Sequence, residues 1–126
     1  MDAKVTSLRS ELERFAVLSG DDWLTLPLVT AGGDGLISVT SNEVPGAMTA
    51  YVRLALSGDL ESARAEHYRL LPLMDANFLE TNPAPVKAAL ALMGRIQNVL
   101  RLPLVPVTEK TRIALAATLK DLGVEI

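Results

Sequence analysis

The sequence contains no cysteine and only one histidine, His67. The absence of cysteine excludes disulfides, thiolate metal ligands and thiol nucleophiles. With a single histidine, a multi-histidine metal site or a catalytic triad has at most one imidazole to build on. Lys and Arg are few, 12 in total against 15 Asp and Glu, and they are scattered along the chain. This distribution argues against nucleic-acid binding, which needs a basic surface patch.

Long apolar segments are also absent. No stretch approaches the ~18 residues of a membrane span. The N-terminus lacks the apolar core of a signal peptide. We therefore expect a cytoplasmic protein without a membrane partner.

The chain has 126 residues, of which 49% are hydrophobic. That length allows one domain with a real core, but a closed eight-stranded α/β barrel takes roughly 250 residues. Small domains leave much of their surface in water. We therefore expect a chain this short and this apolar to bury part of its surface against a partner subunit or against a missing part of the fold.

Two segments have the same pattern of an apolar strand followed by small polar or acidic residues. The first strand is predicted over about residues 15–19, ahead of Gly20, Asp21 and Asp22, and the second over about residues 35–40. Helices are expected after each strand, so the two strands should be parallel and joined by a helical crossover. Parallel strands end at the same edge, which predicts that residues 20–22 and 40–42 lie close together.

The remaining periodicity predicts helices. They are expected over about residues 2–14, in the run 23–29, from Pro45 to Gly58, from Asp59 onward, over about 85–93, and from Thr108 to Gly123. Ser41 or Asn42 is expected to cap the helix that begins near Pro45. The longest helix should bury a stripe of Leu60, Ala63, His67, Leu71, Met74 and Phe78, with a kink at Pro72. Residues 101–107 should run extended across an apolar surface.

Four motifs occur in order: LSGDD at 18–22, GLISVTSN at 35–42, ETNPAPVK at 80–87 and RLPLVP at 101–106. Together they closely resemble the C-terminal part of dihydrodipicolinate synthase (4-hydroxy-tetrahydrodipicolinate synthase). That family comprises pyruvate-dependent class I aldolase-like (β/α)8 barrels of lysine and diaminopimelate biosynthesis. The resemblance covers essentially the whole chain.

The resemblance implies an α/β fold that is mostly helical by residue count. It consists of the last two strand–helix units of a TIM barrel, residues 1–58, and a three-helix C-terminal extension, residues 59–126. In the family, pyruvate forms a Schiff base with a lysine on the sixth strand, and the enamine attacks aspartate semialdehyde. The chain is expected to begin after that strand, so this lysine, a proton-relaying tyrosine and a threonine pair should all be absent. Lys4 does not match the Schiff-base position.

The resemblance also implies which residues border the pyruvate site. Ile37 matches a position that lines it, and Gly20 with Asp21 matches the loop at its border. No residue of the chain is expected to be catalytic, and no cofactor or metal is expected. Ser41 stands where many relatives have alanine.

Asp21 and Asp22 admit two interpretations. Adjacent carboxylates can split their pKa values and form an acid/base pair. The favoured interpretation is that one caps the next helix and the other is solvated. His67 lies on an apolar helix stripe and is expected to be structural or at an interface.

Lys87 and the glycine turn at residues 32–35 also resemble functional features. A desolvated lysine can form a Schiff base, but Lys87 follows two prolines at a helix start, which favours a structural or ion-pairing role. A glycine-rich loop that cradles phosphate lies between a strand and a helix. Residues 32–35 precede a strand instead, so a helix end and a turn explain them.

Three functions are compatible with these features. The first is the C-terminal part of a dihydrodipicolinate synthase-like lyase, inactive alone, that forms a homo-oligomer or joins a missing N-terminal half. The second is a non-catalytic helical interaction or oligomerisation module. The third is a fragment of a sister pyruvate-dependent aldolase, for instance one that acts on sugar acids.

Overall fold

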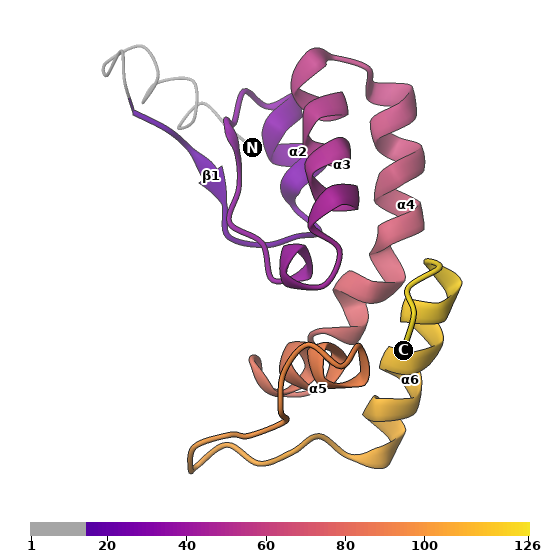
Figure 1. Ribbon diagram of the computed structural model, residues 1–126. Coiled ribbons are helices and arrows are strands. Elements are labelled where there is room, and N and C mark those ends of the chain that lie inside the picture. Colours follow the sequence, from indigo (N-terminus) through magenta and orange to yellow (C-terminus); the bar gives the residue numbers. More distant parts are fainter. Residues whose placement is uncertain (1–14) are drawn as a thin grey trace.

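A computed structural model describes residues 15–126 (Figure 1). The expected helix over residues 2–14, and Lys4 within it, lie outside the described residues. The elements in chain order are β1 (Leu18–Ser19), α2 (Thr25–Thr30), β2 (Gly35–Leu36), the 3-10 turn η1 (Thr40–Asn42), α3 (Pro45–Ser57), α4 (Leu60–Ala76), α5 (Ala84–Leu92) and α6 (Glu109–Asp121).

The two strands pair in parallel, as the sequence predicts. Leu18 aligns with Gly35 and Ser19 with Leu36. The Ile37 amide adds a further hydrogen bond of 2.8 Å to the carbonyl of Ser19. Both strands are shorter than the predicted ranges. β2 ends early because the chain turns into η1, where the Asp22 carboxylate binds backbone amides that would otherwise continue a ladder.

The helix ends follow local chemistry in most places. Pro45 occupies the first position of α3, and Gly58 ends that helix at a φ of 83°, a left-handed conformation that glycine adopts without strain. Asp59 accepts a hydrogen bond from the Ser62 amide and caps α4. Thr108 caps α6 in the same way through the Thr111 amide.

The predicted cap of α3 is wrong. Val44 occupies the N-cap position, and its side chain makes no capping hydrogen bond. The side-chain Nδ2 of Asn42 instead donates to the Val39 carbonyl at 2.8 Å, and the Ser41 hydroxyl donates to the Ser38 carbonyl at 3.2 Å. These short polar side chains therefore bond backward to the residues just before η1, and do not cap α3.

The hydrophobic core runs along α4, which joins the two ends of the molecule (Figure 1). Near α2 and α3, Leu70 and Met74 pack with Met48 and Tyr51. Near α5 and α6, Leu73 and Ala76 pack with a second cluster of Ala88, Ala89, Leu115 and Leu119. The boundary proposed after residue 58 stays a prediction, and the first of these clusters crosses it.

The predicted stripe of α4 is partly wrong. Ala63 and Met74 are buried, but Leu60 is 45% and Phe78 is 39% exposed, while Leu70 and Leu73 are fully buried. A buried face predicted from one regular spacing misses these two leucines, because α4 packs first against α3 and then, further along, against α6. The axis of α4 changes direction toward its end in Figure 1, as Pro72 inside the helix leads one to expect.

Residues 101–107 contain no helix, as expected, but they are not held flat against an apolar surface. Leu102 is 87% and Val105 is 61% exposed. Val107 packs against the core beside α6. The predicted extended backbone is wrong at Leu102 and Pro103, which form a turn closed by a 3.0 Å hydrogen bond from the Leu104 amide to the Arg101 carbonyl. Only some of the apolar side chains meet the core.

His67 has the structural role that the sequence favours. Its Nδ1 lies 3.0 Å from the Tyr51 hydroxyl. Burial lowers the pKa of His67 and raises the pKa of Tyr51 to about 12. A hydrogen bond between the neutral imidazole and the neutral phenol therefore ties α3 to α4. No helix within residues 15–126 is long and apolar enough to cross a membrane.

The core beside α6 can be tested with two helix positions of opposite exposure. Leu119 is fully buried, and Leu119→Ala should lower the free energy of unfolding by about 2–5 kcal/mol, because the transfer and cavity costs add. Ile113 on the same helix is 59% exposed, and Ile113→Ala should change it by less than about 0.5 kcal/mol. Urea unfolding followed by circular dichroism measures both, and equal losses would contradict this packing.

Candidate functional site

The carboxylate of Asp22 joins the ends of the two strands. Asp22 is 1% exposed. Its Oδ1 accepts a hydrogen bond of 2.5 Å from the Ser38 hydroxyl. Its Oδ2 accepts three more, at 3.1 Å from the Val39 amide and at 3.1 and 3.0 Å from the amide and hydroxyl of Thr40. We call Asp22, Ser38, Val39 and Thr40 the Asp22 clamp. It confirms that the residues after β1 and β2 meet at one edge.

The prediction for the aspartate pair is wrong. Leu24 holds the N-cap position of α2 without a side-chain hydrogen bond, so neither aspartate caps that helix. Asp22 is buried rather than solvated. Asp21 accepts a hydrogen bond from the Trp23 amide at 3.3 Å, and its carbonyl accepts one of 2.6 Å from the Ser19 hydroxyl. Both oxygens of Asp22 are engaged in the clamp, so the pair does not form an exposed acid/base couple.

Gly20, Asp21 and Ile37 come from the carboxyl ends of neighbouring strands. Gly20 is exposed, and a methyl group in place of its hydrogen would meet no atom within 4 Å. Ile37 follows β2 directly and is 67% exposed. The structure thus brings the three predicted residues to one end of the sheet, and Ile37 presents an apolar side chain there. Their contact with pyruvate stays a prediction.

Two buried polar residues beside the clamp were not found from the sequence. Glu43 is 4% exposed, and its Oε2 accepts a hydrogen bond of 2.7 Å from Nδ2 of Asn77. The two residues are 34 positions apart. No local pattern reveals such a pair, because a Glu before a helix and an Asn after one are both usually solvated.

The described residues offer no metal site and no reactive lysine at the strand ends. Residues 15–126 hold no cluster of three His, Asp or Glu side chains that could bind a metal. Lys87 lies on α5, and its ammonium group donates to the carbonyl of Val99. This contact agrees with the structural role expected for Lys87.

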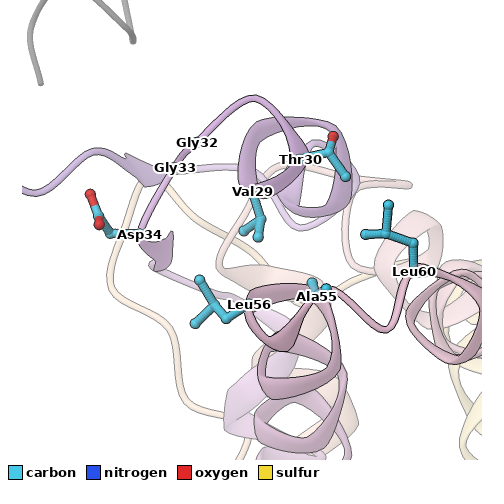
Figure 2. A pocket seen from close by; sticks show the side chains of 9 residues that line it. Val29, Thr30, Gly32, Gly33, Asp34, Ala55, Leu56 and Leu60 are labelled. Atoms are coloured by element: carbon cyan, nitrogen blue, oxygen red, sulfur yellow. The ribbon is translucent and has the colours of Figure 1, made fainter.

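A hollow of about 380 Å³ lies at the opposite end of the strands, where α2 ends and β2 begins (Figure 2). Its walls include Val29, Leu56 and Leu60. The Asp34 carboxylate at its edge accepts a hydrogen bond of 2.8 Å from the Val17 amide and so holds the entry to β1. Catalytic groups of α/β barrels lie at the carboxyl ends of the strands, whereas the amino-terminal end serves stability.

The glycine turn beside this hollow has a steric reason. A Cβ at Gly33 would lie 2.7 Å from Cγ of Leu28, which is too close for any other residue. The turn links the end of α2 to the start of β2, and no helix begins there. It is therefore a packing feature, as the sequence predicts, and lacks the helix N-terminus of a phosphate loop.

Comparisons with known proteins agree on one family. Residues 1–122 match the sequence profile described as the dihydrodipicolinate synthetase family. The 4-hydroxy-tetrahydrodipicolinate synthase of Koribacter versatilis is 52% identical over 112 residues, and that of Methanocaldococcus jannaschii is 51% identical over 122 residues. The crystal structure of dihydrodipicolinate synthase from Thermotoga maritima superposes with a TM-score of 0.93 at 51% identity, over 95% of this chain.

The chain spans about two fifths of these proteins. The matched region is 37% of the Koribacter enzyme, 39% of the Methanocaldococcus enzyme and 41% of the Thermotoga maritima structure. The mostly helical content and the one parallel strand pair of residues 15–126 fit a part of such an enzyme.

The Asp22 clamp is testable by neutralising its acceptor. Asp22→Asn should lower the free energy of unfolding by about 2–4 kcal/mol, because an amide group replaces one acceptor oxygen by a donor that faces the hydroxyl or amide donors of the segment after β2. Asp21→Asn is the matched control, since its side chain accepts a single long hydrogen bond, and it should cost less than about 1 kcal/mol. Thermal and urea unfolding measure both, and a larger loss for Asp21→Asn would overturn the clamp.

Proposed function

The chain belongs to the dihydrodipicolinate synthetase family, and on that premise we propose that it forms the last two strand–helix units and the C-terminal helices of a synthase barrel. The observation that carries the proposal is the parallel pair β1–β2, whose carboxyl ends are joined by the Asp22 clamp. A TM-score of 0.93 to the Thermotoga maritima structure supports the same placement.

In the complete enzyme, we propose, pyruvate condenses with aspartate semialdehyde. A lysine amine adds to the keto carbon of pyruvate, water leaves, and the imine loses a proton to give an enamine. The enamine carbon forms the new bond to the aldehyde carbon, and the product cyclises as the lysine is released. Within residues 15–126, lysines occur only on α5 and α6, at Lys87, Lys110 and Lys120. We therefore propose that the Schiff-base lysine comes from outside these residues.

The contribution of this chain is a wall of the pyruvate site. Ile37 would contact the substrate with its apolar side chain, and Gly20 with Asp21 would form the adjoining loop. An exposed isoleucine at a strand end cannot transfer protons, so its effect should be on binding. The Asp22 clamp holds both segments in register.

Uncovered apolar side chains around β1 support a larger assembly. Phe15 is 50%, Leu18 is 44% and Ile37 is 67% exposed. Strand edges with such residues usually pair with other strands or are covered. The other strands of the barrel would cover them in the proposed enzyme.

The same exposed side chains support a second candidate function, a non-catalytic oligomerisation module. That function predicts self-association of the isolated chain and no activity when the chain completes a barrel. A sister pyruvate-dependent aldolase predicts activity with pyruvate and a different aldehyde. Aldehyde specificity in a completed barrel separates these two from the proposed synthase.

A chimera tests the proposed wall of the site. Residues 15–126 replace the matching C-terminal part of the Thermotoga maritima enzyme, and steady-state kinetics are measured with pyruvate and aspartate semialdehyde. Ile37→Ala should raise KM for pyruvate about tenfold with a smaller change in kcat, because one apolar contact is worth about 1–3 kcal/mol. Ile113→Ala, an exposed isoleucine on α6, should leave both constants unchanged. A chimera that folds but is inactive would contradict the proposal.

The location of the Schiff base gives an independent prediction. Incubation of the isolated 126-residue chain with pyruvate and borohydride should add no mass, whereas the chimera should gain one reduced pyruvate. Intact-mass spectrometry followed by peptide mapping reads both. A covalent adduct on any lysine of the isolated chain would show that its own amines form the imine.

A further inference from the structure

Glu43 is a carboxyl group that the proposed reaction does not use and that water does not reach. It lies between η1 and α3 and is 4% exposed. The one hydrogen-bond partner of its side chain within residues 15–126 is Asn77, which directly follows α4, at 2.7 Å from Nδ2 to Oε2. An ionised carboxylate in such a place normally accepts several hydrogen bonds or faces a cation.

The hydrogen-bond donors around Glu43 and Asn77 leave the acceptors of the two side chains one proton short. Nδ2 of Asn77 donates to Glu43 and, at 3.4 Å, to the hydroxyl of Thr40, so both amide hydrogens are used. The Thr40 hydroxyl in turn donates to Asp22. Oε1 of Glu43 and Oδ1 of Asn77 are both buried without a partner in the described part of the chain. Two acceptors on neighbouring groups thus lack a donor.

The charges around Glu43 disfavour a second anion. Asp22, saturated by four hydrogen bonds in the clamp, is the ionisable group whose charge acts on it. On α3, Tyr51 is bonded to His67 and Arg53 is exposed. On α4, Asp75 is exposed, and on α5 the Lys87 ammonium is bonded to a backbone carbonyl. None of these elements supplies a cation to Glu43.

We propose that Glu43 is a neutral carboxylic acid at neutral pH, and that its proton completes an acid–amide pair with Asn77 which locks the segment after β2 to the end of α4. The acid O–H donates to the amide oxygen while the amide N–H donates to the acid carbonyl, so the two unpartnered oxygens satisfy each other's need. Asp22 and Glu43 then form a buried pair with opposite protonation states, one ionised and one neutral.

The lock has a defined pH range. Burial, with a smaller contribution from the charge of Asp22, raises the pKa of Glu43 from 4.5 to about 8, against a lowering effect of the Asn77 hydrogen bond. Because the folded chain holds this proton more tightly than the unfolded chain, its stabilising contribution is complete below pH 4.5 and is lost as the pH rises through about 8. Above that pH the pair opens, and the segment of residues 38–42 that follows β2 loosens.

The protonation state can be read directly. The 126-residue chain is labelled with carbon-13 at the glutamate side-chain carboxyls, and Glu43 is assigned through bonds and by its absence in Glu43→Gln. The Glu43 carboxyl should titrate with a midpoint near 8. The backbone amides of Thr40 and Asn77 should shift with the same midpoint in the unsubstituted chain and stay still in Glu43→Gln.

Stability gives a second measurement. Between pH 5 and pH 8 the Tm of the unsubstituted chain should fall by roughly 10–15 °C more than that of Glu43→Gln, whose amide keeps the shape and does not ionise. Glu125→Gln, which removes an exposed charge near the C-terminus, should follow the unsubstituted chain.

Two results would overturn the proposal. One is a Glu43 midpoint in the ordinary glutamate range, about 3 to 5.5. The other is a titration near 8 that leaves Thr40 and Asn77 unmoved, which would remove the lock. Because neither measurement involves pyruvate, failure here leaves the proposed enzyme function intact, and an inactive chimera leaves the acid–amide pair intact.

Discussion

The structure depends first on the buried carboxylate of Asp22. Two strands of two residues each supply too few backbone hydrogen bonds to fix their own register. Asp22 adds four hydrogen bonds from the segment after β2, and burial makes each of them hard to replace with water. A buried carboxylate is stable only when all its hydrogen-bond partners are present, so the segments after both strands must be in place at the same time.

The clamp also connects the sheet to the helices. Thr40 donates to Asp22 and accepts from Asn77, and Asn77 also donates to Glu43. This chain of hydrogen bonds leads from the end of β1 to the end of α4. From there the apolar residues of α4 continue the connection, since Leu73 and Ala76 pack with α5 and α6. The strand ends are therefore anchored to the C-terminal helices through polar contacts and then through core packing.

The sequence predicts what is local or periodic. The parallel strand pair, the proline at the start of α3, the glycine that ends it and the caps at Asp59 and Thr108 all follow from residue type and spacing. The four motifs also identify the family. What fails is what depends on distant partners: two adjacent aspartates read as a cap and a solvated residue, although Asp22 binds residues 16 to 18 positions away. The pairing of Asn77 with Glu43 could not be predicted from the sequence for the same reason.

The two carboxyls at the strand ends show how a shared burial can produce opposite charge states. Asp22 faces two hydroxyls and two amides and can remain ionised, whereas Glu43 faces one amide and the negative charge of Asp22. Ionising both would place two anions in one dry region, and neutralising both would leave the donors around Asp22 without their anion. The arrangement is stable with one charge, which is held at the carboxyl ends of β1 and β2. The polar network thus fixes the backbone after β1 and β2 while Ile37 stays exposed at the same end of the sheet.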